Sequence, residues 1–287
     1  MAHPLPGPAA PPPLGPDGFD WTVWNADPIL VAGLVLAGGL YVGALVRRRR
    51  RAPTPPVEAP RVIAFFAGLG VMFASLTGPL HDLSDYYLFS AHMVQHLLLA
   101  FAVPPLLLGG TPRWLADALL TSVPPALRRL ARILTRPSGA FAAFNLVLVA
   151  WHLPPLYNLA MVQHPVHIVQ HLMILVVSVL LWWPVLSPSR LLPRAPYPVQ
   201  LLYLFVVGLP MVVVSIFITM AEAVLYPYYA AAPRVFAHLT PHADQHLGGL
   251  IMWIPGGMVF LVANAVVFYR WQGAGGDDVA IEAAEVG

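Results

Sequence analysis

Cysteine and lysine are both absent from this 287-residue sequence, and charged residues of any kind make up only 10% of it. Without cysteine, disulfide bonds, thiolate metal ligands and cysteine nucleophiles are all excluded. A soluble domain of this size carries roughly 25% charged residues. The net charge of +2 comes from arginines scattered between hydrophobic runs, a pattern that does not indicate a nucleic-acid partner. The 58% of hydrophobic residues predicts instead a protein embedded in the lipid bilayer.

Stretches without Asp, Glu, Lys or Arg predict the membrane spans, because a spanning helix needs roughly 20 mostly apolar residues. The stretch 137–189 is long enough for two helices, and a break fits at Pro154 and Pro155, since the residue before a proline is pushed out of helical geometry. Five further stretches give one span each: 28–46, 62–80, 86–112, 195–221 and 245–269. The predicted fold class is therefore an all-α membrane protein, a bundle of seven transmembrane helices.

The arginines predict how this bundle is oriented. In a seven-helix arrangement 14 arginines lie on one side of the membrane and only Arg234 lies on the other. By the positive-inside rule the arginine-rich side is cytoplasmic, so the N-terminus is outside and the C-terminus is cytoplasmic. We expect a disordered, Pro-rich outer tail at residues 1–25, a seven-helix transmembrane domain at 26–272 and a disordered, acidic cytoplasmic tail at 273–287.

The histidines gather on the opposite, outer side, and six of the 11 repeat one pattern. The segments 92–96, 167–171 and 242–246 each have the sequence His-x-x-Gln-His. Helical positions four apart share a face, with Cβ atoms about 5–6 Å apart, so two imidazoles there can bind one metal ion. The Gln of each motif shares that face and can hold an imidazole N–H. The predicted metal ligands are His92, His96, His152, His167, His171, His242 and His246, whereas the roles of His164 and His238 stay open.

The available donors limit the choice of metal. Imidazole suits copper, zinc, iron and nickel. Met72, Met161 and Met220 lie toward the outer half of their predicted spans and can help to hold Cu(I), whereas Met93 points off the histidine face of its helix and is expected to pack. Seven histidines exceed one tetrahedral site, which favours more than one metal ion or a transfer path.

The three His pairs are expected to converge on one outward-opening cavity. His92 and His96 lie too deep in the bilayer to be hydrated by bulk water, so they need polar partners across the bundle. Among the outer carboxylates, Asp244 is expected to bind metal or to orient His242. The remaining outer acidic residues are expected to be solvated loop charges: Asp82, Asp85 and Glu222.

Three segments of the chain resemble one known family. AHMVQHLLL, WHLPPLYNLAMVQHPVHIVQHLMI and HADQHLGGLIMWIPGG are similar to the membrane-embedded CtaG family, the assembly factors of caa-type cytochrome c oxidases. The resemblance covers roughly residues 28 to 270. It implies a multi-pass protein of the bacterial plasma (inner) membrane that is not an enzyme and helps an oxidase to mature through its copper. The implied partners are the subunits of a haem–copper oxidase, within the lipid bilayer.

Other classes of membrane protein fit the histidines less well. A b-type haem needs axial ligands on opposite faces, usually from two helices, and two histidines on one helical face fit this poorly. A di-iron oxygenase or desaturase typically has about eight histidines facing the cytoplasm by family analogy. A proton transporter needs buried acidic groups, yet apart from Glu222 the acidic residues avoid the spans. A copper-binding assembly factor is the preferred hypothesis, and a haem or di-iron redox protein is the alternative.

Overall fold

The computed structural model describes residues 14, 15, 18–51 and 57–286, and this part of the chain is helical with no β-strand. Six of its helices are long and apolar enough to cross a membrane, and a bent helix pair raises the number to seven if the pair is counted as one span. The prediction of an all-α, multi-pass membrane protein is therefore confirmed. The six spans are Pro28–Arg51, Ala59–Thr77, Phe89–Gly110, His164–Leu186, Tyr197–Met220 and Pro241–Ala274.

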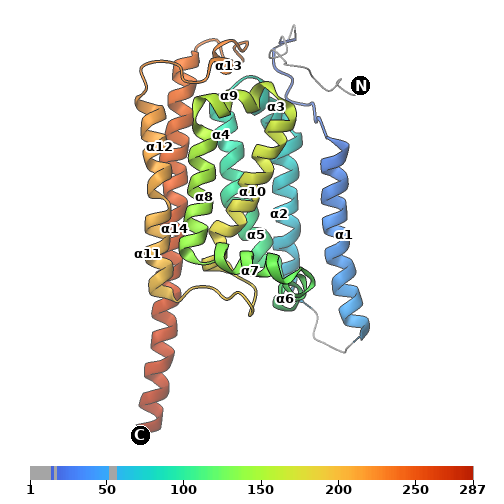
Figure 1. Cartoon of the computed structure of the whole chain (residues 1–287), viewed down its shortest axis with the longest axis vertical. Coiled ribbons are helices and arrows are strands. Elements are labelled where there is room, and N and C mark those ends of the chain that lie inside the picture. The colour runs from blue at the N-terminus through green and yellow to red at the C-terminus, as the bar shows by residue number, and fades with distance from the viewer. Residues whose placement is uncertain (1–13, 16–17, 52–56, 287) are drawn as a thin grey trace.

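The spanning helices run side by side, and short helices lie across both ends of the bundle (Figure 1). The short helices α3, α9 and α13 lie at the end near the N-terminus, and α6 and α7 lie at the opposite end. In chain order the elements are α1 (Pro28–Arg51), α2 (Ala59–Thr77), α3 (Pro79–Tyr86), α4 (Phe89–Leu97), η1 (Leu98–Ala102), α5 (Val103–Gly110), α6 (Arg113–Ser122), α7 (Pro125–Leu134), α8 (Pro137–His152), α9 (Pro154–Val162), α10 (His164–Leu186), α11 (Tyr197–Val207), α12 (Leu209–Met220), α13 (Pro227–Ala230) and α14 (Pro241–Val286).

The fourth predicted span, which begins at Pro137, corresponds to α8, a 16-residue helix that follows the short helix α7. The two helices meet at 84°, so α7 lies across the end of the bundle while α8 runs along it. The α7 sequence explains this, because Leu127 and Leu130 are exposed on a helix that also carries Arg128 and Arg132. A short amphipathic, basic helix of this kind lies in the plane of a membrane surface rather than through it.

The third span changes its helical geometry just below the histidines. Its first part, α4, ends in a π-helical turn, η1, and continues as α5. Pro104 follows this turn and has no N–H to donate to the carbonyl of Ala100, four residues earlier. The indole N–H of Trp182 on α10 donates to that carbonyl instead, at 2.9 Å. A neighbouring helix therefore satisfies the freed backbone group, as a low-dielectric interior requires.

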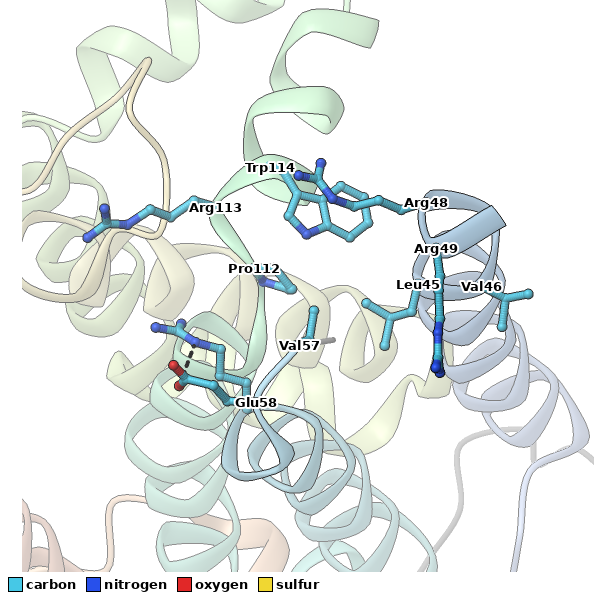
Figure 2. A pocket seen from close by; sticks show the side chains of 10 residues that line it. Leu45, Val46, Arg48, Arg49, Val57, Glu58, Pro112, Arg113 and Trp114 are labelled. Atoms are coloured by element: carbon cyan, nitrogen blue, oxygen red, sulfur yellow. Dashed lines mark ion pairs between the residues drawn. The ribbon is translucent and has the colours of Figure 1, made fainter. Parts of the chain in front are cut away.

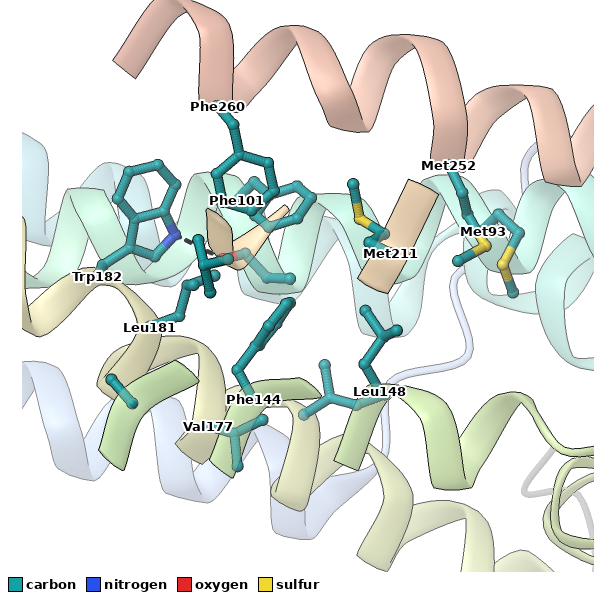
Figure 3. Packing of buried hydrophobic residues seen from close by; sticks show 14 of the residues in the cluster. Met93, Phe101, Phe144, Leu148, Val177, Leu181, Trp182, Met211, Met252 and Phe260 are labelled. Carbon is teal, nitrogen blue, oxygen red and sulfur yellow. Dashed lines mark hydrogen bonds between the residues drawn. The ribbon is translucent and has the colours of Figure 1, made fainter. Parts of the chain in front are cut away.

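The apolar core lies between α4, α8, α10, α11, α12 and α14 (Figure 3). Phe101 packs edge-to-face on Phe260 with ring centroids 5.2 Å apart, and Trp182 lies over the same ring. The helices also approach closely at Gly248, where an added Cβ would overlap the ring of Phe89. This contact brings the start of α14 against the start of α4, which positions the third histidine motif.

Helix α1 is only loosely attached to the rest of the bundle. Its buried residues are Leu34, Gly38 and Tyr41. The Tyr41 ring stacks on Phe65, with centroids 3.9 Å apart, and its hydroxyl donates to the carbonyl of Gly110 at 2.9 Å. At the arginine-rich end of α1, the guanidinium of Arg48 lies over the indole ring of Trp114 in the first turn of α6 (Figure 2). Most of α1 therefore remains available to face lipid.

The described part of the N-terminal segment contacts the bundle, and the C-terminal segment extends its last helix. Residues 18–25 contact the end of the bundle near α3, because the Phe19 ring packs on Tyr87 and the Trp24 ring stacks on Phe73. The tail predicted at residues 1–25 also includes residues 1–13, which lie outside the described residues. At the other end, α14 continues to Val286, through the segment predicted as a separate tail.

Candidate metal centre

The first two histidine pairs meet in the interior of the bundle. The rings of His92 and His96 on α4 have centroids 4.1 Å apart, and those of His167 and His171 on α10 are 4.3 Å apart. Across the two helices, His92 lies 5.5 Å from His167 and His96 lies 5.4 Å from His171, again between centroids. Four imidazoles therefore form one cluster between α4 and α10.

Two sets of three side chains in this cluster place their donor atoms within 4.8 Å of one another. The inner set is His92, His96 and His171, and the outer set is Asp85, His92 and His167. His92 belongs to both sets and is completely buried. Because both sets use His92, the geometry defines two overlapping positions for a cation.

Contacts with oxygen atoms orient the rings of His92 and His167. The Nδ1 atom of His92 lies 3.3 Å from the carbonyl oxygen of Ser84, and that of His167 lies 3.4 Å from a carboxylate oxygen of Asp85. Carbonyl and carboxylate oxygens only accept, so the tautomer that satisfies these contacts has its proton on Nδ1 and its lone pair on Nε2. Neither Nε2 has a hydrogen-bond partner in the described part of the chain. Metal-bound histidines are held in this way.

Three further imidazoles carry buried nitrogens without partners. His152, at the end of α8, places Nδ1 2.6 Å from the carbonyl oxygen of Leu148, which leaves its Nε2 free. Both ring nitrogens of His96 and the Nε2 of His171 also lack partners among the described residues. Burying a polar group without a hydrogen bond costs free energy, so a cluster of such nitrogens calls for a ligand.

Asp85 is a member of the cluster, which corrects the prediction that it is a solvated loop charge. Residues 79–86 form helix α3 rather than a loop, and this helix turns Asp85 inward until only 7% of it is exposed. Its carboxylate lies 3.4 Å from the Nδ1 atoms of both His81 and His167. Burial raises the pKa of Asp85, but these two imidazoles outweigh it and hold the pKa well below its usual range.

Two tyrosines that the sequence analysis did not single out adjoin the cluster. The hydroxyl of Tyr229 donates to the carbonyl of Ser84 at 2.6 Å and lies 3.1 Å from Nδ1 of His92. The hydroxyl of Tyr157 donates to Tyr229 at 3.3 Å. Burial raises the pKa of Tyr229 well above its usual value, so the group stays a neutral hydroxyl. The tyrosine-rich segment 226–229 was the sequence signal for this contact.

The predicted methionine helpers differ in burial. Met161 is buried, with its sulfur 3.6 Å from the hydroxyl of Tyr229. Met220, by contrast, is 65% exposed. Met93 is completely buried; it packs in the apolar core and also lines a small cavity together with His96.

The glutamines of the motifs do not hold the histidines of their own pairs. Gln95 donates to the carbonyl of Ser75 at 2.7 Å and lies 3.1 Å from Nδ1 of His81 on α3. Gln170 is fully buried, and neither side-chain polar atom has a partner in the described ranges. The expectation was that a motif Gln accepts an imidazole N–H, but Gln95 contacts His81 through its amide NH2 group, which donates, and its Oε1 has no partner among the described residues.

The third pair, His242 and His246 on α14, lies apart from the two ligand sets. Its rings contact each other, with centroids 4.2 Å apart, and neither described ligand set includes them. His242 instead places Nε2 3.0 Å from the carbonyl oxygen of Ala221, and Gln245 accepts from the backbone N–H of Leu225 at 2.6 Å. The motif thus holds the loop after α12, while the Nε2 of His246 is buried without a partner in the described part of the chain. The two ligand sets draw only on the first two pairs and Asp85.

Asp244 has a structural role that replaces both functions predicted for it. Its carboxylate accepts from the backbone N–H groups of Phe89 and Ser90, at 2.8 and 3.1 Å, and from the Ser90 hydroxyl. These are the first N–H groups of α4, which have no partner within their own helix. A carboxylate at a helix N-terminus also complements the helix dipole. Asp244 of α14 therefore caps the helix that carries His92 and His96.

The fold and the cluster define a multi-pass membrane protein with a buried, histidine-rich interior. The model of the cytochrome c oxidase caa3 assembly factor family (Caa3_CtaG) matches residues 39–274, and the chain belongs to this family.

Curated relatives extend the comparison. The chain is 31% identical over 256 residues to uncharacterized proteins of Mycobacterium bovis and Mycobacterium tuberculosis, an alignment that covers 81% of this chain and 37% of each relative. It is 26% identical over 272 residues to an uncharacterized protein of Mycobacterium leprae, covering 88% of this chain and 40% of the relative. The chain thus spans about two-fifths of the length of these relatives. No solved structure matches the chain.

Proposed function

We propose that this cytochrome c oxidase assembly factor binds copper in the cluster between α4 and α10 and delivers it to a subunit of a haem–copper oxidase. One observation carries the proposal. His92, His152 and His167 hold Nδ1 against an oxygen acceptor and leave a buried Nε2 without a partner. Imidazoles in this arrangement are prepared to bind a metal ion, and doing so offsets the cost of burying them.

The donor set and the available space favour copper. The cluster offers imidazoles and a single carboxylate, and the chain has no thiolate. Among the metals that imidazole suits, copper is the one that links this site to the assembly of a haem–copper oxidase. A cavity of about 40 Å³ lies beside His96 and His152. It admits an ion, whereas pockets for larger cofactors measure roughly 300–1,000 Å³, which argues against the haem alternative.

The burial of the cluster suggests how the ion enters it. The side chain of His81 is 23% exposed and contacts Asp85, whose side chain is 9% exposed and contacts His167. His92 follows and is fully buried. We therefore propose that the ion enters at the outer set, where the Asp85 carboxylate offsets its charge, and then moves to the inner set. His92 remains bound during this exchange because it belongs to both.

The proposed direction of delivery is outward, across the plasma membrane of a bacterium. The histidines lie at the end of the bundle opposite the arginine-rich connections, and arginines mark the cytoplasmic side. Reporter fusions after Arg132 are expected to report the cytoplasm, and fusions near His238 the outside. A cytoplasmic signal at His238 would reverse the direction of delivery.

Metal analysis of the detergent-purified protein tests the copper proposal directly. The protein is expected to retain copper after passage over a weak chelator, in preference to zinc or iron. In cells, deletion is expected to lower the copper content and activity of the oxidase while transcription of its subunits continues. A purified protein without affinity for copper would refute the metal site. A copper-replete oxidase in the deletion strain, with no redundant factor, would refute the delivery role.

A further inference from the structure

Three methionines line the small cavity next to the inner ligand set. Met93 of α4, Met211 of α12 and Met252 of α14 contribute to its wall together with His96 and His152. Figure 3 shows the side chains of Met93 and Met252 next to each other, with Met211 between this pair and Phe101. The cavity measures about 40 Å³ and its other walls are apolar. Three thioethers and two imidazoles thus surround one dry space in the middle of the bundle.

Methionine often fills gaps in apolar cores, so its presence alone does not define a site. The histidines of the cavity distinguish it from ordinary packing. His96 is buried, with only 7% of its surface exposed, and neither of its ring nitrogens has a partner in the described part of the chain. The Nε2 of His152 is also unpartnered. Apolar packing leaves these nitrogens unsatisfied, whereas a soft cation in the cavity provides a partner for both.

We propose that this cavity, defined by Met93, Met211, Met252, His96 and His152, is a second copper position that is selective for Cu(I). The inference rests on the proposed function, because it takes copper as the cargo. Thioethers are soft ligands that select Cu(I) over harder cations. His96 belongs to the inner set and also lines the cavity, so it joins the two positions. The ion moves by ligand exchange: copper–nitrogen bonds to His92 and His171 break, copper–sulfur bonds form, and the ion remains Cu(I) throughout.

X-ray absorption of the full-length protein loaded with Cu(I) without oxygen tests this assignment. The chain has no cysteine, so a copper–sulfur signal can come only from methionine. We expect sulfur in the coordination shell of the wild-type protein. We expect the signal to disappear in the triple variant Met93→Leu, Met211→Leu, Met252→Leu, because leucine preserves the volume but not the sulfur. The matched control Met72→Leu, Met220→Leu lies outside the cavity and is expected to keep the signal.

The possible results separate this inference from the proposed function. Bound copper with a nitrogen-only spectrum in the wild-type protein would overturn the methionine position and leave the imidazole site standing. Absence of any bound copper would overturn both. If the triple variant fails to fold, the single variants Met93→Leu, Met211→Leu and Met252→Leu are each expected to lower the sulfur contribution by about one ligand. An unchanged spectrum in all three would overturn the assignment.

A different observation, at the opposite end of the molecule, carries a second inference. A cavity of about 500 Å³ lies between the end of α1, the start of α2 and the α5–α6 connection. Figure 2 shows Arg48 and Arg49 on the α1 side of this cavity and Trp114 and Arg113 on the other. Its full lining is Leu45, Val46, Arg48, Arg49, Val57, Glu58, Arg61, Pro112, Arg113 and Trp114.

Two of the four guanidiniums in this cavity already have partners. Arg61 pairs with Glu58 at 3.6 Å, and Arg48 lies over the ring of Trp114 at 4.6 Å. Within the described residues, Arg49 and Arg113 have no ion pair or side-chain hydrogen bond. Guanidinium groups bind phosphate oxygens in a bidentate manner. The cavity also has apolar walls and adjoins the exposed apolar side chains of α1. Apolar walls favour a ligand with an acyl chain over a soluble anion, which has only polar groups to bind.

We propose that an anionic phospholipid headgroup binds at this cavity, with Arg49 and Arg113 as its guanidinium ligands, and that it fastens the loosely packed α1 to the bundle. Basic pockets between membrane helices bind such headgroups. Native mass spectrometry with phosphatidylglycerol tests this: the variant Arg49→Gln, Arg113→Gln is expected to bind about tenfold more weakly than wild type. The control Arg129→Gln, Arg132→Gln loses the same charge on α7 and is expected to bind as wild type does. Equal loss in both variants, equal binding of phosphatidylcholine, or displacement by inorganic phosphate would overturn the inference.

Discussion

Two of the three His-x-x-Gln-His motifs differ from the third in what they contact, although their sequences are nearly the same. The motifs of α4 and α10 face each other and leave imidazole nitrogens without partners. In the motif of α14, Gln245 and His242 contact the loop after α12 and Asp244 caps α4, although the Nε2 of His246 also lacks a partner among the described residues. The same spacing therefore builds a candidate metal site in one place and supports the helix of that site in another.

The difference teaches that a ligand motif becomes a site only through the helix opposite to it. His92 and His96 meet a second histidine pair and the carboxylate of Asp85 across the bundle. His242 meets a backbone carbonyl instead. A carbonyl accepts the N–H of one imidazole and completes the hydrogen bonding of that nitrogen. Where imidazoles face one another with lone pairs on their Nε2 atoms, neither ring has a proton to donate, so a shared proton or a metal ion is needed between them.

The largest expected effect comes from removing the shared pair. The variant His92→Leu, His96→Leu deletes two of three ligands from the inner set and one from the outer set, so copper affinity is expected to fall by at least about a hundredfold. Leucine suits an apolar interior, and the fold is expected to persist. Copper titration of the purified protein, with its thermal transition as a check of folding, measures this. Full copper stoichiometry in a folded variant would contradict the shared role of His92.

The next effect concerns charge in the outer set. The substitution Asp85→Asn keeps the shape of the side chain but removes the carboxylate that lies 3.4 Å from His81 and His167. Copper uptake is expected to slow by about tenfold, because a buried cation loses its nearest counter-charge. Stopped-flow mixing with a chromophoric copper chelate measures the rate. Uptake at the wild-type rate would place the entry path elsewhere.

A moderate effect on stability is expected from the cap on α4. The substitution Asp244→Ala leaves the N–H groups of Phe89 and Ser90 without their acceptor, and loss of such a cap costs about 0.5–2 kcal/mol. Asp244→Asn restores the acceptor without the charge and is expected to recover part of the loss. Thermal unfolding in detergent compares the three proteins. Equal stability of the alanine variant would show that the cap is dispensable.

The smallest effect separates the third motif from the other two. The variant His242→Leu, His246→Leu is expected to bind copper with an affinity within about twofold of wild type, since neither residue belongs to a ligand set. The same copper titration applies, and the α4 double variant is the positive control. A loss comparable to that control would bring the third pair into the site and restore the predicted convergence of all three.

The sequence predicted much of the fold because lipid imposes simple rules. Backbone groups in a bilayer must be satisfied internally, so long apolar stretches become helices, and their number follows from length. The prediction is less complete at the span formed by residues 137–152, where the preceding α7 bends by 84° across the end of the bundle. Hydropathy does not reveal a bend of this kind. Neither α7, with 10 residues, nor α8, with 16, is long enough to span the membrane alone, and only the two together have the length and apolar character of a span.

The candidate site was predictable only as a set of side chains. Spacing along one helix indicated which two histidines share a face, and this holds for each pair, with ring centroids 4.1–4.3 Å apart. Asp85 and Tyr229 escaped prediction because they lie on other elements than His92. Asp85 lies on α3, 7 residues before His92, and Tyr229 lies on α13, 137 residues after it. No local periodicity relates residues on different elements.

By itself the sequence determined the class of protein, the apolar spans and the three histidine pairs, because composition and helical periodicity are local properties. The tertiary structure decided which pairs meet, which carboxylate joins them and which one caps a helix. Asp85 precedes the first histidine motif and Asp244 lies within the third. Asp85 contacts imidazoles, whereas Asp244 accepts hydrogen bonds from the N-terminal N–H groups of α4. Only the packing of α3, α4, α10 and α14 separates these roles, because a carboxylate accepts hydrogen bonds from whichever donors the neighbouring helix presents.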